Sequence, residues 1–326
     1  MYLPGSFGAA LVLCIMSTVC WGSWANTYKG AKNYPFALFY WDYIFGVVLC
    51  SLVLAFTLGS HGAGEPFLKN LANAAPSNWL AAVVAGVIFN VANVLLVAAI
   101  DVAGLSIAFP IGIGIAVVEG VALSYALQPK GDARFLVGGL VLALAAVLFD
   151  ALAYRSLEDE AKKGAVRLGV ILSVVSGVLM GAFAPFVARA MTVEPALTPY
   201  SVSVLFALGA LACCLVFNVY MMARPIYGSP VGFGEYFRNG PRNHMLGLLG
   251  GITWALGGCF NFIAAGFVGV PISYAIGQSA PLIAAGWGVF VWHEFNGAPR
   301  RAWLALVGMF VCYVAAISTI ALAYRS

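Results

Sequence analysis

Four acidic side chains stand inside the long apolar runs of this sequence. Asp42 lies among aromatic residues in FYWDY and Glu119 lies within IAVVEGVAL, whereas Asp101 and Asp150 stand at the ends of their runs. At those ends, interfacial water is enough to explain a carboxylate. A carboxyl group removed from water favours its neutral, protonated form unless a cation pairs with it. Asp42 and Glu119 are therefore candidate proton carriers, and the alternative for each is a structural hydrogen bond to a Tyr, Trp or backbone donor.

Neutral polar and aromatic side chains form a second candidate group. Asn90 and Asn93 are three residues apart and so share one face of a helix. The other candidate contacts for a bound solute are Trp21, Trp24, Tyr43, Thr253, Trp254, Asn261, Tyr274 and Gln278. Amides both donate and accept hydrogen bonds and aromatic faces stack on rings, so this set suits a small neutral polar solute. Alternatively, an asparagine only bonds a neighbouring helix, a contact worth about 0.6 kcal/mol on average.

The remaining reactive side chains do not assemble into a catalytic set. The histidines (His61, His244 and His293) fall at the ends of predicted helices and form no cluster in the sequence. The seven cysteines lie within apolar runs, with neither a disulfide framework nor a metal spacing. Arg189, the one basic residue close to a predicted helix interior, lies at a helix end, so nothing predicts an anionic substrate. We therefore expect no enzyme, no cofactor and no metal site.

The composition determines the surroundings of these residues. Hydrophobic residues make up 63% of the 326 positions and charged residues only 9%, against about 25% charged in soluble domains. Apolar runs of about twenty residues indicate transmembrane helices. We predict an all-α membrane protein whose first run is a true helix and not a cleaved signal peptide. The ten predicted helices are 6–26, 36–58, 79–101, 104–127, 134–154, 167–189, 199–222, 243–267, 271–292 and 301–323.

The basic residues predict the orientation in the membrane, because cytoplasmic loops carry more Lys and Arg. The net charge of +4 comes from residues at helix ends, so it indicates topology and not nucleic-acid binding. The odd-numbered connections hold Lys29, Lys32, Arg155, Lys162, Lys163, Arg167, Arg224, Arg238, Arg242, Arg300 and Arg301. The termini and the even-numbered connections hold Lys69, Lys130, Arg134, Arg189 and Arg325. This bias predicts a plasma (bacterial inner) membrane protein with both termini outside and the central loop, RSLEDEAKKGAVR, in the cytoplasm.

The chain also repeats itself. The string ALAYRS occurs at 151–156 and again at 321–326. A shift of 165 residues aligns three pairs of glycines, which are Gly86 with Gly251, Gly104 with Gly269, and Gly112 with Gly277. Five helices in each half, 1–157 and 158–326, make an inverted repeat, an architecture that many secondary transporters use. The alternative is two unrelated helical halves.

Two repeat-equivalent segments predict weak points in helices. Pro110, Gly112 and Gly114 lie near the start of the fourth predicted helix. The ninth contains Pro271, Gly277 and Pro281. Proline removes a backbone donor and glycine loosens the helix, so freed carbonyl groups at these helix breaks can face a cavity. Alternatively, these small residues serve close packing between helices.

Several stretches resemble the ureide permease family, which belongs to the drug/metabolite transporter superfamily near the glucose/ribose porters and the L-rhamnose–proton symporters. They are CWGSWANTYK, FALFYWDY, GLSIAFPIGIGIAVVEGVALSYALQPKGD, GAFAPF and ARPIYG, and the resemblance spans nearly the whole chain. The resemblance implies a ten-helix, inverted-repeat carrier that uses protons to drive uptake. Plant members carry allantoin and related oxo-purines or pyrimidines, whereas bacterial relatives are mostly called sugar transporters. Asp42 matches the family's aromatic-Asp-Tyr element, whereas Glu119 and the short central loop depart from its pattern.

These observations together predict a proton-coupled symporter that takes up a small neutral polar solute, either a sugar or an allantoin- or nucleobase-like heterocycle. The third, fourth, eighth and ninth helices would line its site, with Trp21 and Asp42 closing one side. Asp42 would act as a gate or coupling residue on the inner side, and Glu119 as a deeper proton carrier. The alternatives are a multidrug or metabolite exporter and a membrane sensor that transports nothing.

Overall fold

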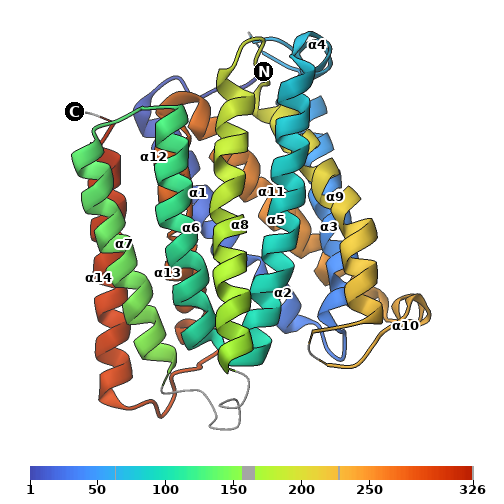
Figure 1. Cartoon of the computed structure of the whole chain (residues 1–326), viewed down its shortest axis with the longest axis vertical. Coiled ribbons are helices and arrows are strands. Elements are labelled where there is room, and N and C mark those ends of the chain that lie inside the picture. Colours follow the sequence, from blue (N-terminus) through green and yellow to red (C-terminus); the bar gives the residue numbers. More distant parts are fainter. Residues whose placement is uncertain (63, 156–165, 227, 325–326) are drawn as a thin grey trace. The chain divides into compact units, whose positions relative to one another are not determined.

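The structure, a computed structural model, describes residues 1–62, 64–155, 166–226 and 228–324. Within these residues every regular element is a helix (Figure 1). The helices are α1 (Phe7–Ser23), α2 (Ala25–Gly30), α3 (Phe36–Phe56), α4 (Phe67–Asn73), α5 (Pro76–Ala103), α6 (Leu105–Leu127), α7 (Ala133–Tyr154), α8 (Val166–Thr192), α9 (Pro199–Ala223), α10 (Phe233–Arg238), α11 (Pro241–Val268), α12 (Val270–Gly277), α13 (Ala280–Phe290) and α14 (Arg300–Leu322).

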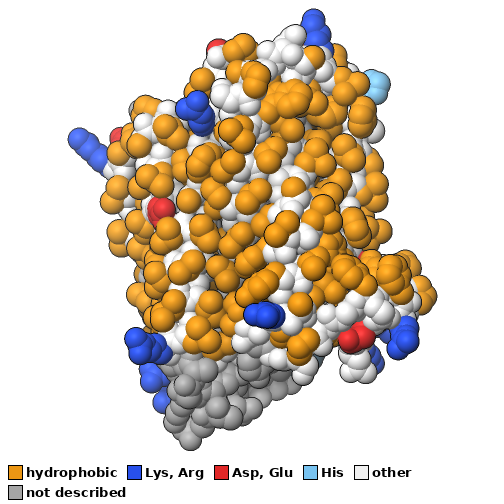
Figure 2. All heavy atoms as spheres, turned by 45° about the vertical axis from the view of Figure 1, so that its right-hand side comes forward, with side chains coloured by type: hydrophobic (Ala, Val, Ile, Leu, Met, Phe, Trp, Pro, Cys, Tyr) orange, Lys and Arg blue, Asp and Glu red, His pale blue; other side chains and the backbone are white. Residues whose placement is uncertain are grey.

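The predicted all-α membrane class is confirmed. Nine helical segments of the described chain are long and apolar enough to cross a membrane. Hydrophobic side chains cover most of the face shown in Figure 2. Large apolar residues such as Val141, Leu148 and Val311 are more than half exposed. Water would not stabilise so much exposed apolar surface, so lipid must cover it.

The ninth predicted helix is interrupted. It forms as α12, which ends at Gly277, and α13, which begins at Ala280 with Pro281 in its first turn. In the first half the structure differs from the prediction of a break at Pro110, Gly112 and Gly114. There α6 runs unbroken through all three residues, with Pro110 inside the helix.

In the first half the interruption comes before α6, at Gly104. This glycine adopts φ 86° and ψ 161°, and Gly269, its predicted repeat equivalent, adopts φ 93° and ψ 152° before α12. Residues with side chains rarely adopt this backbone conformation. The two aligned glycines therefore end one helix and start the next in the same way, although the repeat itself stays a prediction.

The described chain forms two compact units. Unit 1 comprises Met1–Asn90 and Phe186–Phe267, and unit 2 comprises Val91–Pro185 and Val268–Ser326. Each unit combines segments from both halves of the sequence.

Glycines bring pairs of helices together in unit 1. A Cβ atom added to Gly251 of α11 would meet the backbone of α3 at Tyr43, and one added to Gly46 of α3 would meet the backbone of α11. Gly86 of α5 and Gly209 of α9 have the same reciprocal relation. Direct contact between backbones holds these helices at close range, so the residues beside the glycines have fixed positions.

Unit 2 has its own hydrophobic core. In it α7 packs along α14, and the two lie side by side in Figure 1, while α6 packs on α7 and on α12. Val117, Val147, Phe295, Met309 and Tyr313 are among the buried residues of this core.

Candidate functional site

Trp254 of α11 lies at the centre of an aromatic cluster in unit 1. Its ring centroid lies 4.5 Å from that of Phe89 in α5, 5.8 Å from that of Phe206 in α9 and 6.0 Å from that of Trp21 in α1. Trp21 and Phe206 lie nearly parallel to Trp254, with interplanar angles of 20° and 17°. Trp21 also donates its Nε1–H to the Trp254 carbonyl oxygen at 3.2 Å. Four helices thus contribute flat apolar faces to one cluster.

Polar atoms extend this cluster along α3 and α5. The Tyr43 ring lies 6.5 Å from Trp254 and 4.9 Å from Trp24, and it stacks on Tyr40 at 5.2 Å. The Tyr40 hydroxyl donates to Oδ1 of Asn90 at 3.0 Å. Tyr43 and Asn90 are fully buried, yet the Tyr43 hydroxyl and the Asn90 amide nitrogen have no hydrogen-bond partner among the described residues.

Two buried polar groups without partners are costly. Each costs about 1–3 kcal/mol, and native proteins keep few of them. The Cys213 thiol lies beside the Asn90 amide, but a thiol is only a weak acceptor. A flat solute that exchanges hydrogen bonds with the amide and the hydroxyl would satisfy both groups and stack on the neighbouring rings. The cluster therefore combines the two features that the sequence predicted for a solute site, aromatic faces and a neutral amide.

Three side chains from three different segments converge on the Asp42 carboxylate in α3. The Tyr34 hydroxyl, from the segment before α3, donates to Oδ2 at 2.6 Å, and the Tyr236 hydroxyl of α10 donates to Oδ1 at 2.6 Å. Nδ1 of His244 in α11 lies 2.9 Å from Oδ2. An ionised carboxylate only accepts hydrogen bonds, so this network assigns the ring hydrogen of His244 to Nδ1.

The two tyrosines are permanent donors at neutral pH. Burial raises the pKa of Tyr34 and of Tyr236, and the hydrogen bond from each hydroxyl to Asp42 raises it further. His244 pairs with Asp42 as an ion pair only when its ring is protonated.

Asn243 and Gly247 hold the segments around Asp42 in place. The Asn243 amide nitrogen donates to the Lys32 carbonyl oxygen at 2.9 Å and to Oδ1 of Asn239 at 2.6 Å, and its Oδ1 accepts from the Lys32 N–H at 3.3 Å. An ideal Cβ atom on Gly247 would lie 2.5 Å from Cβ of Asp42, so only glycine permits this approach of α11 to α3.

Other predicted site residues belong to unit 2. Glu119 of α6 is partly exposed, and its side chain packs on Gly181 of α8, where an ideal Cβ atom would lie 2.9 Å from Cβ of Glu119. The buried Tyr274 hydroxyl of α12 donates to the carbonyl oxygens of Met180 at 3.0 Å and Ala116 at 3.3 Å. Tyr274 thus ties α12 to α6 and α8.

The two predicted asparagines of α5 fall in different units. Asn90 ends the first segment of unit 1, and Asn93 lies in unit 2, as does Gln278, the partly exposed residue that caps α12.

Two predicted contacts have structural partners in unit 1. The Thr253 hydroxyl donates to the Leu249 carbonyl oxygen of its own helix at 2.8 Å. The Asn261 amide donates to the Ser17 hydroxyl at 3.4 Å and so links α11 to α1. For Asn261, the structure therefore favours the alternative interpretation of a bond between neighbouring helices.

The structure corrects the expectation that interfacial water explains Asp150. This residue is only 4% exposed, because α14 packs along α7 where Asp150 lies. Its Oδ1 and the buried Tyr313 hydroxyl of α14 have no hydrogen-bond partner among the described residues. Close by, the Tyr154 hydroxyl donates to Oε2 of Glu294 at 3.2 Å.

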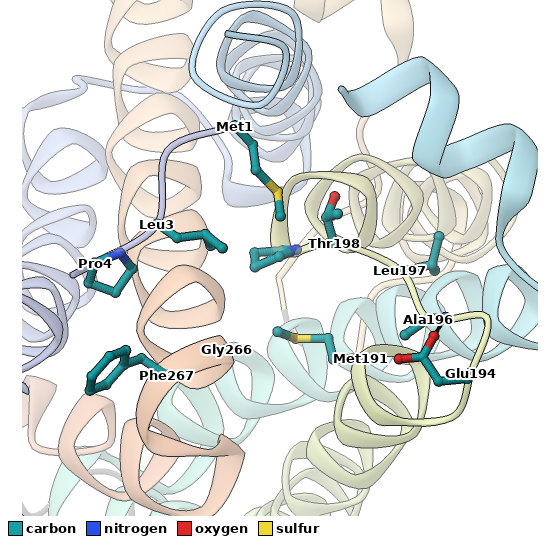
Figure 3. Close-up of a pocket in the computed structure, with 11 residues that line it drawn as sticks. Met1, Leu3, Pro4, Met191, Glu194, Ala196, Leu197, Thr198, Gly266 and Phe267 are labelled. Carbon is teal, nitrogen blue, oxygen red and sulfur yellow. Dashed lines mark hydrogen bonds between the residues drawn. The ribbon is translucent and has the colours of Figure 1, made fainter. Parts of the chain in front are cut away.

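A pocket of about 280 Å³ lies elsewhere in unit 1. Figure 3 shows its lining, which comes from residues 1–4, from the segment between Met191 and Pro199, and from Gly266 and Phe267 at the end of α11. The lining is mostly apolar, and its carboxylate, that of Glu194, accepts the Ala196 N–H at 3.0 Å. None of the predicted solute contacts lines this pocket.

No three His, Cys, Asp or Glu side chains of the described residues gather to hold a metal ion.

Sequence reasoning missed five of the residues around the two clusters. Phe89 and Phe206 lie within ordinary apolar runs, which contain no signal that separates them from packing residues. Tyr34, Tyr236 and His244 lie 8, 194 and 202 residues from Asp42 in the sequence. Only Tyr34 is close enough for the local pattern to have suggested it.

The membrane-length helices of the described residues define an integral membrane protein, and the family comparison makes it a transporter. The model of the ureide permease family matches residues 39–167 and 162–323. The chain belongs to the ureide permease family, and this match confirms the resemblance seen in the sequence.

Relatives of known sequence agree with this assignment. The chain is 21% identical over 386 residues to ureide permease 1 of Arabidopsis thaliana and 22% identical over 391 residues to ureide permease 2, with 98% of each chain covered. A solved structure described as "Crystal structure of protein" superimposes with a TM-score of 0.66 at 13% identity, covering 98% of this chain and 100% of that chain. This last likeness concerns the fold alone.

Proposed function

We propose that the protein is a secondary active transporter that takes up a ureide or a nucleobase-like heterocycle together with a proton. The observation that carries the proposal is the buried Asp42 carboxylate, whose three side-chain partners are two tyrosines and one histidine. None of these partners is a permanent cation, so the carboxylate can take up and lose a proton without breaking a salt bridge to Lys or Arg.

The choice of solute rests on the aromatic cluster and on the relatives. Rings at Trp21, Trp254 and Tyr43 offer flat faces, and the Asn90 amide and the Tyr43 hydroxyl have free hydrogen-bonding atoms. The N–H and C=O edge of a ureide or an oxo-pyrimidine matches such atoms, and its plane matches the rings. The relatives from Arabidopsis are described as ureide permeases. A sugar is the alternative solute, because its apolar face also stacks on aromatic rings.

The proposed cycle uses Asp42 as the coupling acid on the inner side of the membrane. Protonated Asp42 favours the loaded state, and loss of the proton to the cytoplasm favours release of the solute. Basic residues near Asp42 and its partners in the sequence favour the cytoplasmic side, because cytoplasmic segments carry more Lys and Arg. These residues are Lys29, Lys32, Arg238 and Arg242. The same rule predicts both termini outside the plasma membrane. Glu119 is the second candidate for the coupling acid.

Uptake by the purified protein in liposomes tests the proposal. Radiolabelled allantoin, uracil and glucose are presented separately, with the outside acidic or with the gradient collapsed by a protonophore. We expect allantoin or uracil to accumulate only with the gradient, and Asp42→Asn to abolish accumulation while Glu119→Gln retains it. Gradient-dependent accumulation of glucose alone would assign the solute to the sugars. If neither ureides nor sugars accumulate faster with the gradient, the proposed coupling is wrong.

A further inference from the structure

Asp42 and its histidine partner differ in their access to solvent. The Asp42 side chain is 8% exposed, whereas the His244 side chain is 27% exposed. Tyr34, Tyr236 and His244 each lie within hydrogen-bond distance of the carboxylate, so each offers a route for a proton between Asp42 and water. The tyrosines hold their protons at neutral pH, but an imidazole ring both gains and loses one there. His244 is therefore the one of these three side chains suited to pass a proton.

The surroundings of His244 hold its ring in one orientation. The ring meets Tyr236 edge to face at 4.7 Å and Tyr34 at 5.6 Å. Nδ1 faces both Oδ2 of Asp42, at 2.9 Å, and the Tyr34 hydroxyl, at 3.2 Å. Exchange with water is thus left to the other ring nitrogen, Nε2.

The part of α11 that carries His244 lies at an aqueous boundary. His244 is the fourth residue of this helix, and it follows the exposed Pro241 and Arg242. The charged and titratable groups on the neighbouring segments, besides Asp42 and the two tyrosines, are Lys29 of α2, Lys32 of the segment before α3, Glu235 and Arg238 of α10, and Arg242 of α11.

We propose that His244 is the proton relay between the aqueous phase and Asp42. This inference rests on the proposed function, because it assigns the route of the proton that Asp42 binds. His244 is a positioning and relay residue that contacts the coupling acid and not the solute.

The relay conserves protons and charge at each step. Release to the cytoplasm begins with a neutral carboxyl group and a neutral ring that carries its hydrogen on Nε2. The carboxyl group passes its proton from Oδ2 to Nδ1, which leaves a carboxylate and a protonated ring. The ring then loses the Nε2 proton to water and becomes neutral, with its remaining hydrogen on Nδ1. No other co-reactant is needed.

Two transport assays on the same proteoliposomes separate the relay from coupling itself. Gradient-driven accumulation of allantoin requires net proton movement, whereas exchange of internal for external allantoin requires none. His244→Asn keeps a side-chain donor near the position of Nδ1 but cannot relay a proton. We expect His244→Asn to lower gradient-driven accumulation about tenfold or more, the scale of a lost acid–base group, and to leave exchange at the wild-type rate. His61→Asn, a change at an exposed histidine outside the network, serves as the matched control and should alter neither assay.

Chemical rescue gives a second and independent readout. His244→Ala leaves space beside Asp42. Added imidazole should restore accumulation, and the restored rate should rise with the total imidazole concentration. Wild-type protein without any response to the gradient would refute the proposed function. With a responsive wild type, normal accumulation and a normal pH profile in His244→Asn would refute the relay. Loss of exchange in His244→Ala, or accumulation that imidazole fails to restore, would also refute it and would make His244 a structural residue.

Discussion

Gly247 provides the most direct test of the geometry around Asp42. The variant Gly247→Ala adds one methyl carbon at a point 2.5 Å from Cβ of Asp42 and 3.2 Å from the Phe39 carbonyl oxygen. Because non-bonded carbon atoms normally stay about 3.5–4.0 Å apart, Asp42 or α11 has to move by about 1 Å. A shift of about 1 Å would lengthen the 2.6 Å bonds from Tyr34 and Tyr236 to about 3.6 Å, beyond hydrogen-bond range.

This change should affect both stability and transport. Overpacking of this kind costs about 1–3 kcal/mol, and a loss of about 2 kcal/mol lowers the melting midpoint of a chain of this length by about 3 °C. Gradient-driven accumulation of allantoin should fall with it, because the partners of the coupling acid are displaced. The assays are thermal melting of the purified protein in detergent and uptake into liposomes.

Gly266→Ala is the matched control, since Gly266 lies in the same helix. Its added methyl carbon would lie 3.7 Å from Cγ of Pro199, an ordinary contact. Alanine is favoured over glycine in a helix by about 1 kcal/mol, so this variant should melt at or above the wild-type midpoint. If Gly247→Ala melts like Gly266→Ala and keeps gradient-driven uptake, then α11 does not approach Asp42 as described.

Three further predictions concern the two clusters. Tyr43→Phe removes a buried hydroxyl without a partner, so it should raise the melting midpoint and weaken the stabilisation by allantoin. Tyr40→Phe removes a hydroxyl that is bonded to the Asn90 amide, so it should lower the midpoint. Equal midpoints of the two variants would contradict the assignment. Trp254→Ala should abolish the stabilisation by allantoin in a thermal-shift assay, and Trp254→Phe should retain part of it. Full stabilisation of both variants would show that this ring does not contact the solute. Burial raises the pKa of Tyr34 and Tyr236 in the folded protein above the unfolded value of about 10. Their contribution to stability is therefore complete below that pH and is lost as the pH rises beyond it. Between pH 8 and 11 the melting midpoint should fall less steeply in the double variant Tyr34→Phe/Tyr236→Phe than in the wild type.

The helices could be predicted from the sequence almost residue by residue. Composition and the positions of charges located every membrane-length helix to within three or four residues, because a lipid environment forces each apolar run into a helix that bonds its own backbone. The interruption at Gly277 also follows from local chemistry, since glycine and proline act on their own backbone. Pro110 shows the limit of this reasoning, because the same residue type is accommodated inside α6.

The candidate site could be predicted only in part. Asp42, Trp21, Tyr43, Asn90 and Trp254 stand out in the sequence, because polar and aromatic residues are conspicuous in apolar runs. Their assembly into an aromatic cluster and a carboxylate network does not follow from those positions. It depends on helix crossings at which backbones touch, and nothing local states which helices cross.

The sequence by itself determined that this chain is an all-α membrane protein of the ureide permease type, because hydrophobicity, helix length and motifs are local properties. Only the tertiary structure decided which acid has partners. Asp42 receives a hydrogen bond from a tyrosine 194 residues away and contacts a histidine 202 residues away, whereas Asp150, expected at an interface, is buried. These outcomes depend on helix packing, in which glycines let backbones touch and many side chains must fit together at once, and no stretch of sequence states that fit locally.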